Sequence, residues 1–224
     1  LTSPPRVTEA YTFEQAEKEL QEKNYDLIIV MPAMQDANVF KKIKRLKKSY
    51  QNIPLVLLTP FSHEVSRRLA KEDLSAVDYT FSWLGNADLL LAIVKLMEDN
   101  MNLEEDVASV GVQVIIVVED SIRFYSSILP ILYKVVLKQS QIFSTGALNR
   151  HEQMLRMRGR PKIVLARTYE EAVEIYDKYS SNVLGVVTDV SFTRNGEKDS
   201  KAGLKFCEYL RCHNEDLPII IDSS

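Results

Sequence analysis

Two adjacent carboxylates, Glu119 and Asp120, come directly after the apolar run VIIVV at 114–118. A run of β-branched residues of this kind is typical of a strand buried on both faces of a parallel sheet. Two acidic side chains at the end of such a strand could hold a divalent cation, because Mg²⁺ prefers oxygen ligands. Asp120 or Ser121 could instead cap a following helix, since Asp and Ser are preferred at that position.

Two further polar residues come at the ends of apolar runs. Asp189 follows GVVT at 185–188, and Ser223 follows PIIID at 218–222. Like the acidic pair, each of these residues stands directly after an apolar run that predicts a strand. Taken singly, Asp189 could cap the turn after its strand, and Ser223 could be an ordinary loop residue.

The elements that must position these residues occur twice along the chain. The sequence TFEQA at 12–16 recurs as TYEEA at 168–172. Each copy predicts an amphipathic helix with Thr as its N-cap, followed by an apolar strand at 25–30 or at 182–187. A further helix and a short strand that begins after proline follow in both copies. This shared order of elements indicates a duplication.

Strands that alternate with helices of about 10–15 residues predict βαβ units with helices on both faces of parallel sheets. We therefore expect an α/β fold with two doubly wound parallel-sheet domains in tandem, both incomplete. The first domain is predicted at 1–100 and the second at 112–224, the latter without its last strand and helices. The polar segment 101–111 is predicted to be the linker.

The composition, 46% hydrophobic and 26% charged, is ordinary for a soluble globular protein. The formal net charge of −3 gives no reason to expect nucleic acid or an anionic membrane as a partner. The basic stretch at 41–48 has the spacing of a surface helix with a solvated face. The only cysteines, Cys207 and Cys212, form neither a disulfide framework nor a zinc pattern. With no apolar run long enough to span a bilayer, we expect a cytoplasmic protein.

The second copy resembles the receiver domains of bacterial two-component response regulators. The resemblance is carried by the pair Glu119 and Asp120, by Asp189 after the third strand and by Ser223 after the fourth. It implies a flavodoxin-like sheet in the order 2-1-3-4-5, in which strands 1 and 3 adjoin at the topological switch point. It also implies signal transduction in a phosphorelay, with a histidine kinase or phosphotransfer protein as the partner.

By this resemblance, Asp189 is the phosphoryl acceptor and Mg²⁺ is the cofactor. Asp120, Asp189 and the backbone carbonyl of Ser191 would hold the metal, with Glu119 acting partly through water. The hydroxyl of Ser223 would donate a hydrogen bond to a phosphoryl oxygen. The lysine that receiver domains carry after strand 5 is not present, because the second copy ends after its fourth strand.

The first copy lacks matching acids. Aligned on the repeat, Met31 stands where the second copy has Asp189, and Asp36 is the nearest carboxylate. Thr59 matches the hydroxyl position, whereas 81–83 reads FSW where a lysine is expected. We predict a degenerate pseudo-receiver whose role is packing or partner contact rather than phosphoryl transfer. The whole chain could also form a homodimer.

A narrower resemblance rests on short motifs of the second copy, LPILY at 129–133, MRGRPKIVLA at 157–166 and TDVSF at 188–192. They are similar to receiver-like modules in front of phosphoenolpyruvate synthase or pyruvate phosphate dikinase type enzymes, which implies a fused enzyme domain. The polar, glycine-containing segment 191–203 is predicted to be a loop that forms a lid or a partner contact beside the acceptor.

Two alternatives come from other functional classes. A phosphate-independent scaffold would use both copies for dimerisation, and Asp189→Asn would then leave assembly unchanged. A metal-dependent phosphohydrolase would use Asp189 as its nucleophile, but that class generally has a second acid two residues later, where this chain has Ser191. Whether the chain forms part of an enzyme is left open by the sequence.

Overall fold

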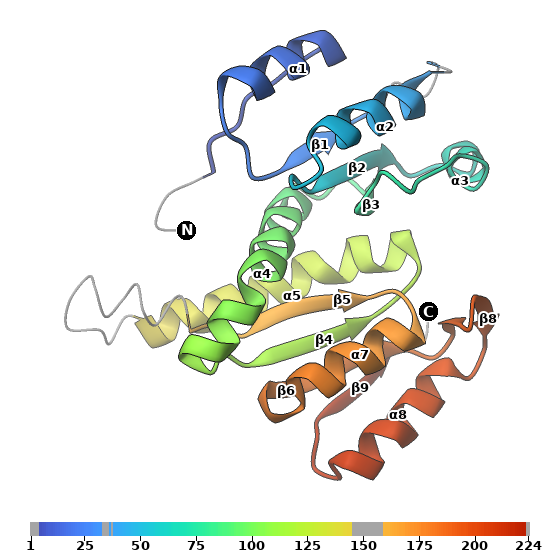
Figure 1. The fold of residues 1–224 in the computed structure, drawn as a ribbon. Helices are drawn as coiled ribbons and strands as arrows, with labels where there is room; N and C mark the ends of the chain where they lie inside the picture. Colours follow the sequence, from blue (N-terminus) through green and yellow to red (C-terminus); the bar gives the residue numbers. More distant parts are fainter. Residues whose placement is uncertain (1–4, 33–35, 37, 145–158, 223–224) are drawn as a thin grey trace. The chain divides into compact units, whose positions relative to one another are not determined.

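The computed structural model describes residues 5–32, 36, 38–144 and 159–222, and the chain divides into two compact units, Leu1–Asn86 and Ala87–Ser224 (Figure 1). Each unit contains a parallel sheet with helices. The expected α/β class with parallel sheets is therefore confirmed. In the part of the chain that the structure describes, no helix is both long enough and apolar enough to cross a membrane.

Unit 1 is built on a three-stranded parallel sheet in the order β1-β2-β3. Ile43 and Leu46 of its second helix pack in one core cluster with Leu55 and Leu57 of the central strand. The basic residues of 41–48 alternate with these apolar positions, so the predicted surface helix is present. The elements of unit 1 are α1 (Phe13–Glu22), β1 (Ile28–Val30), α2 (Val39–Ser49), β2 (Leu55–Pro60), α3 (His63–Leu69) and β3 (Tyr79–Trp83).

Unit 2 contains a four-stranded parallel sheet and a short antiparallel hairpin. Its helices are α4 (Asp88–Val110), α5 (Ile122–Ser144), α7 (Tyr169–Tyr179), η1 (Ser180–Asn182) and α8 (Ala202–His213). The sheet strands are β4 (Val114–Val118), β5 (Lys162–Ala166), β6 (Val183–Asp189) and β9 (Ile219–Asp222), and the hairpin strands are β7 (Phe192–Arg194) and β8 (Glu197–Asp199).

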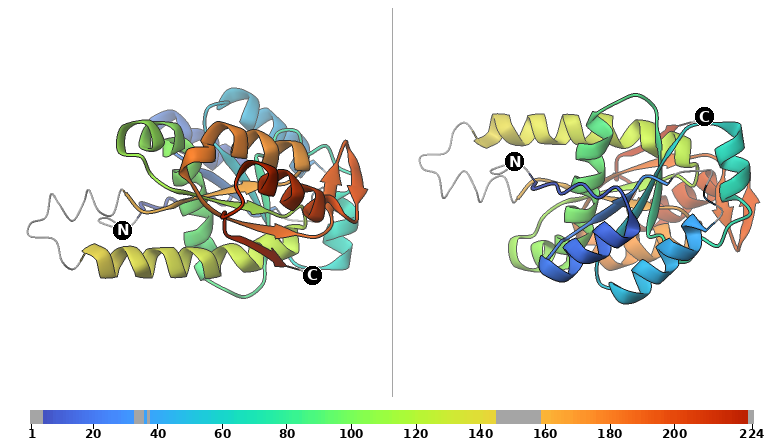
Figure 2. Two further views of the ribbon diagram at one scale, coloured as in Figure 1. Left: turned by 90° about the horizontal axis from the view of Figure 1, so that it is seen from below. Right: turned by 90° about the horizontal axis from the view of Figure 1, so that it is seen from above.

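The unit 2 sheet has the strand order β5-β4-β6-β9, so β4 lies between the two strands that follow it in the sequence. Helix α5 lies on one face of the sheet, and α7 and α8 lie on the other, as the two views of Figure 2 show. Ile116 and Val118 of β4 pack with Tyr176 of α7 and Phe206 of α8 in one core cluster. Helices on both faces explain why β4 is apolar throughout, and the arrangement is compatible with a flavodoxin-like fold.

The repeated sequence forms the same helix start in both units. The hydroxyl oxygen of Thr12 accepts a hydrogen bond from the backbone N–H of Gln15, and that of Thr168 accepts one from Glu171, each at 3.1 Å. The backbone angles of the two threonines agree within 2°. Each threonine is therefore an N-cap, as predicted, and each satisfies an amide that has no partner inside its helix.

The boundary between the units differs from the expected one. The segment predicted as a linker at 101–111 is the second half of helix α4 up to Val110, and α4 belongs to unit 2. Leu103 and Asp106 in this segment are buried, so the polar composition concealed an inward-facing side. Gly111, with a positive φ of 69°, ends the helix in the left-handed conformation that glycine adopts readily.

A buried ionic network explains why α4 packs against the rest of unit 2. The carboxylate of Asp99 accepts hydrogen bonds from the Arg160 guanidinium, from the hydroxyl of Tyr133 and from the backbone N–H of Ile163. Asp106 forms an ion pair with Lys162 at 2.8 Å. Helix α4 is therefore tied to α5 and to the start of β5 by charges that compensate one another away from water.

Candidate functional site

The carboxyl ends of β4 and β6 bring the acidic residues singled out from the sequence to one edge of the unit 2 sheet. Glu119 and Asp120 directly follow β4, and Asp189 is the last residue of β6. The two strands are neighbours, with Val118 opposite Thr188. We call Glu119, Asp120 and Asp189 the acidic cluster. Three separate sequence positions thus contribute negative charge to the same edge.

A small cavity of about 30 Å³ adjoins the cluster, and its lining includes Glu119, Asp189 and Asp222. This volume holds a water molecule but no metabolite. Asp222 is the last residue of β9 and lies opposite Asp189 in the strand register. Sequence patterns did not single it out, although it follows its apolar run at 219–221 in the same way that Asp189 follows 185–188.

The surroundings of Glu119 change the pKa of its carboxyl group. Its side chain is buried, and its carboxylate accepts a hydrogen bond from the backbone N–H of Ser121 at 2.9 Å. The pKa of Glu119 is raised to about 7, mainly by burial; the Ser121 amide lowers this pKa, and the negative charges of Asp189 and Asp120 contribute to raising it. Near neutral pH, Glu119 therefore exists in both its protonated and its charged form.

Asp120 is bonded to the hairpin through both carboxylate oxygens. Oδ2 accepts hydrogen bonds from the backbone N–H and from the hydroxyl of Thr193, both at 3.0 Å. Oδ1 forms an ion pair with the ammonium group of Lys198, with 2.7 Å between the nitrogen and the oxygen. Asp120 therefore already has a positively charged neighbour supplied by the chain itself.

Asp189 is buried at the start of the turn that follows β6. Its Oδ2 accepts a hydrogen bond from the backbone N–H of Ser191 at 3.2 Å, so it does stabilise a turn, as one interpretation of the sequence expected. Helix α8 packs directly on this turn, because the N–H of Gly203 donates to the carbonyl oxygen of Val190 at 3.0 Å. A methyl group at Gly203 would overlap the carbonyl oxygen of Asp189, so glycine is required for this close approach.

The segment predicted as a polar loop over the site is an ordered β-hairpin. Asn195 and Gly196 form its turn with positive φ angles of 52° and 79°, which is typical of a tight Asn-Gly hairpin turn. The N–H of Asn195 donates to the carboxylate of Glu170 at 2.9 Å, and Phe192 is fully buried. The Asn-Gly pair in the sequence was the signal that could have identified the hairpin.

Two further predictions concern Ser223 and a bound metal ion. Ser223 lies outside the described residues. Within the described ranges, no group of three or more acidic, histidine or cysteine side chains is arranged so that it could hold a metal ion. The donor types nevertheless fit Mg²⁺, because the acidic cluster supplies hard carboxylate oxygens. The negative charges of Asp189 and Asp120 raise the pKa of Glu119, and a bound cation would relieve this repulsion.

Unit 1 presents other chemistry at the corresponding positions. Met31 is 71% exposed, and Thr59 is buried, with its hydroxyl donating to the carbonyl of Phe81 at 3.4 Å. Asp36 accepts from the N–H of Asn38 and pairs with Lys42. The side chains that could receive or bind a phosphoryl group in unit 2 are thus replaced by a thioether, a satisfied hydroxyl and a turn-forming carboxylate.

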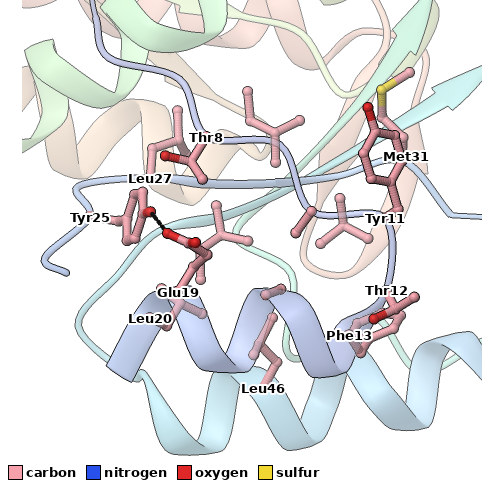
Figure 3. A pocket seen from close by; sticks show the side chains of 15 residues that line it. Thr8, Tyr11, Thr12, Phe13, Glu19, Leu20, Tyr25, Leu27, Met31 and Leu46 are labelled. Carbon is pink, nitrogen blue, oxygen red and sulfur yellow. Dashed lines mark hydrogen bonds between the residues drawn. The ribbon is translucent and has the colours of Figure 1, made fainter. Parts of the chain in front are cut away.

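A pocket of unit 1 lies beside β1, and both polar and apolar side chains line it (Figure 3). Its volume is about 230 Å³, and Leu20, Leu27 and Leu46 contribute to its lining. Glu19 is the acidic lining residue, and its carboxylate accepts a hydrogen bond from the hydroxyl of Tyr25 at 2.9 Å. With that carboxylate engaged, the pocket offers no cluster of acids for phosphoryl chemistry.

Comparisons with known proteins do not assign this chain to a family. A scan against protein-family models matches no family, and a search of curated proteins finds no match. The features of this chain that bear on its function are the strand order of unit 2 and the acidic cluster at the edge of its sheet.

Proposed function

We propose that unit 2 is a receiver domain of a response regulator that accepts a phosphoryl group on Asp189. The observation that supports this is the meeting of Asp189 with the pair Glu119 and Asp120 at the ends of adjacent strands β6 and β4. In a doubly wound sheet, ligands bind outside the carboxyl ends of the strands at the topological switch point. In unit 2 that point lies between the neighbouring strands β4 and β6.

The proposed reaction is transfer from a phosphohistidine of a kinase or phosphotransfer protein. A carboxylate oxygen of Asp189 forms a bond to phosphorus while the phosphorus–nitrogen bond of the donor breaks. The bonding electron pair leaves with the imidazole nitrogen, which takes up a proton. Hydrolysis of the resulting acyl phosphate by water restores the carboxylate and releases inorganic phosphate.

We propose Mg²⁺ as the cofactor, held by Glu119, Asp120 and Asp189 with the backbone carbonyl of Ser191. When bound, it would neutralise negative charge on the transferring oxygens. The chain's own contribution is positional. The amide of Ser191 holds one oxygen of Asp189, and the close packing of Gly203 fixes the turn that follows the acceptor.

The wider organisation is also part of the proposal. Unit 1 is a pseudo-receiver in tandem with unit 2, with a role in partner contact or dimerisation, and the protein works in the cytoplasm. The output is a partner protein or a fused enzyme domain of the phosphoenolpyruvate synthase or pyruvate phosphate dikinase type. Neither nucleic acid nor membrane is a partner.

A phosphate-independent scaffold is the second candidate, and one specific observation favours it. The ion pair between Lys198 and Asp120 satisfies part of the acidic cluster without any metal or phosphoryl group. In that case both units would serve assembly, and the acids would act only as structural partners of the hairpin.

The proposed function is tested by phosphorylation with acetyl phosphate and Mg²⁺, followed by intact-mass measurement and peptide mapping. The wild-type chain should gain one phosphoryl group that hydroxylamine removes, since hydroxylamine cleaves acyl phosphates. Asp189→Asn should gain none. Asp216→Asn, which changes an exposed aspartate of the same unit, is the matched control and should behave like the wild type. Labelling that persists in Asp189→Asn would show that Asp189 is not the phosphoryl acceptor.

A further inference from the structure

We propose that Lys198 acts as a tethered cation that competes with a divalent metal ion for Asp120 and so sets the metal affinity of the acidic cluster. The inference rests on the proposed function, because it concerns the same site. In this proposal, the hairpin formed by β7 and β8 regulates metal binding at the acidic cluster.

The contacts of Asp120 carry the argument. Its Oδ1 lies 2.7 Å from Nζ of Lys198, and its Oδ2 accepts two hydrogen bonds from Thr193. Both carboxylate oxygens are therefore engaged by one hairpin. A metal ion that binds Asp120 must either displace the ammonium group or share an oxygen with a positive charge at short range, and both weaken binding.

The hairpin geometry places these donors together. Thr193 of β7 and Lys198 of β8 are directly opposite in the antiparallel register, and opposite residues of such a pair lie on the same face. One face of the hairpin therefore directs a hydroxyl and an ammonium group toward one carboxylate. The tight turn at Asn195 and Gly196 fixes this register, because the turn type determines which residues are paired.

The hairpin is also anchored away from Asp120. Thr193 forms a β-bridge with Thr168, the N-cap of α7, and the N–H of Asn195 donates to Glu170 in the first turn of that helix. The backbone of the hairpin is thus held in place independently of Lys198. Removing the ammonium group should free an oxygen of Asp120 without releasing the hairpin.

Lys198 can leave Asp120 at small cost. The Lys198 side chain is 56% exposed, whereas that of Asp120 is 17% exposed. An exposed ammonium group is readily rehydrated, so the ion pair is weak enough to yield to a metal ion yet lowers its affinity. The expected size is a change of about three- to fivefold in the dissociation constant, which corresponds to the upper range of an exposed ion pair.

The experiment measures Mn²⁺ binding to the full chain directly, by electron paramagnetic resonance of the free ion, without any phosphoryl donor. Lys198→Met removes the charge and keeps an unbranched side chain. It should bind Mn²⁺ about three- to fivefold more tightly than the wild type. Lys201→Met, which removes an exposed lysine from the same connection, is the matched control and should leave the affinity unchanged. Asp120→Asn should weaken binding in both backgrounds.

The outcomes separate this inference from the proposed function. Equal Mn²⁺ affinity in the wild type and in Lys198→Met, together with phosphorylation of Asp189, would overturn the competition and leave the receiver function standing. Absence of Mn²⁺ binding in both proteins would overturn the competition together with the proposed metal site. A fall in affinity on Lys198→Met would also contradict it, since Lys198 would then support the metal rather than compete with it.

Discussion

At the scale of single residues, the members of the acidic cluster differ in their bonding partners. Asp120 has a lysine and a threonine as partners, whereas Glu119 is buried beside two other carboxylates. Sequence patterns located both residues because they follow an apolar strand. They could not reveal this division of roles, which depends on the hairpin that folds back from 73 or more residues later in the chain.

Glu119 makes the stability of unit 2 dependent on pH. Its pKa is raised from 4.5 to about 7 in the folded chain, so between these values the native state holds a proton that the unfolded chain releases. The unfolding free energy should therefore fall as pH rises through this window, by at most about 3–4 kcal/mol, since one pKa unit corresponds to about 1.4 kcal/mol.

Denaturant unfolding of the wild type and of Glu119→Gln, measured across that pH range, checks this expectation. Glutamine is close in shape to the protonated side chain and does not titrate. The variant should therefore lose clearly less stability than the wild type as pH rises. Parallel curves for the two proteins would show that Glu119 is not the titrating group.

At the scale of elements, the site depends on how closely α8 and the hairpin approach the end of β6. The strands and helices around it could be predicted from apolar runs and from the Thr caps, because these signals are local. The composition of the hairpin segment predicts a polar loop, although Asn195 and Gly196 carry the sequence signature of a tight turn. Its bonds to Asp120 are long-range contacts that no local pattern contains.

Gly203→Ala tests the close approach of α8 to the acceptor. The added methyl group would overlap the backbone of Asp189, so the helix or the turn must shift. We expect a loss of about 1–3 kcal/mol of unfolding free energy and changed amide resonances around Asp189. Glu208→Ala, at an exposed position of the same helix, should leave both unchanged. A Gly203→Ala protein with wild-type stability and spectra would mean that α8 lies farther from β6 than described.

At the scale of the whole molecule, unit 1 ends at Asn86, whereas the composition predicts that the first domain extends to residue 100. The charged composition of the second half of helix α4 is typical of a linker. Asp99 and Asp106 nevertheless face inward, where they form ion pairs with Arg160 and Lys162. A charged residue is normally read as solvent-exposed. The partner that permits burial of Asp99 is 61 residues away in the sequence. Local sequence therefore could not predict that α4 packs within unit 2, which begins at Ala87.

Asp99→Ala should therefore destabilise unit 2 strongly. It leaves the Arg160 guanidinium buried without its carboxylate, and removal of one partner of a buried pair costs about 3–5 kcal/mol. Denaturant unfolding measures the loss. Glu104→Ala lies on the same helix but breaks only an exposed pair with Lys178, so it should change stability little. Similar small effects of both substitutions would contradict the assignment of α4 to the core of unit 2.

The most direct test of the central claim is binding of beryllofluoride, a phosphoryl mimic, to the full chain, followed by ¹⁹F NMR. Bound fluoride resonances should appear for the wild type only when Mg²⁺ is present, and they should be absent for Asp189→Asn. Resonances that persist in Asp189→Asn would contradict the account. A wild-type chain that binds no beryllofluoride at any Mg²⁺ concentration would contradict it as well, and would leave the scaffold as the function that unit 2 serves.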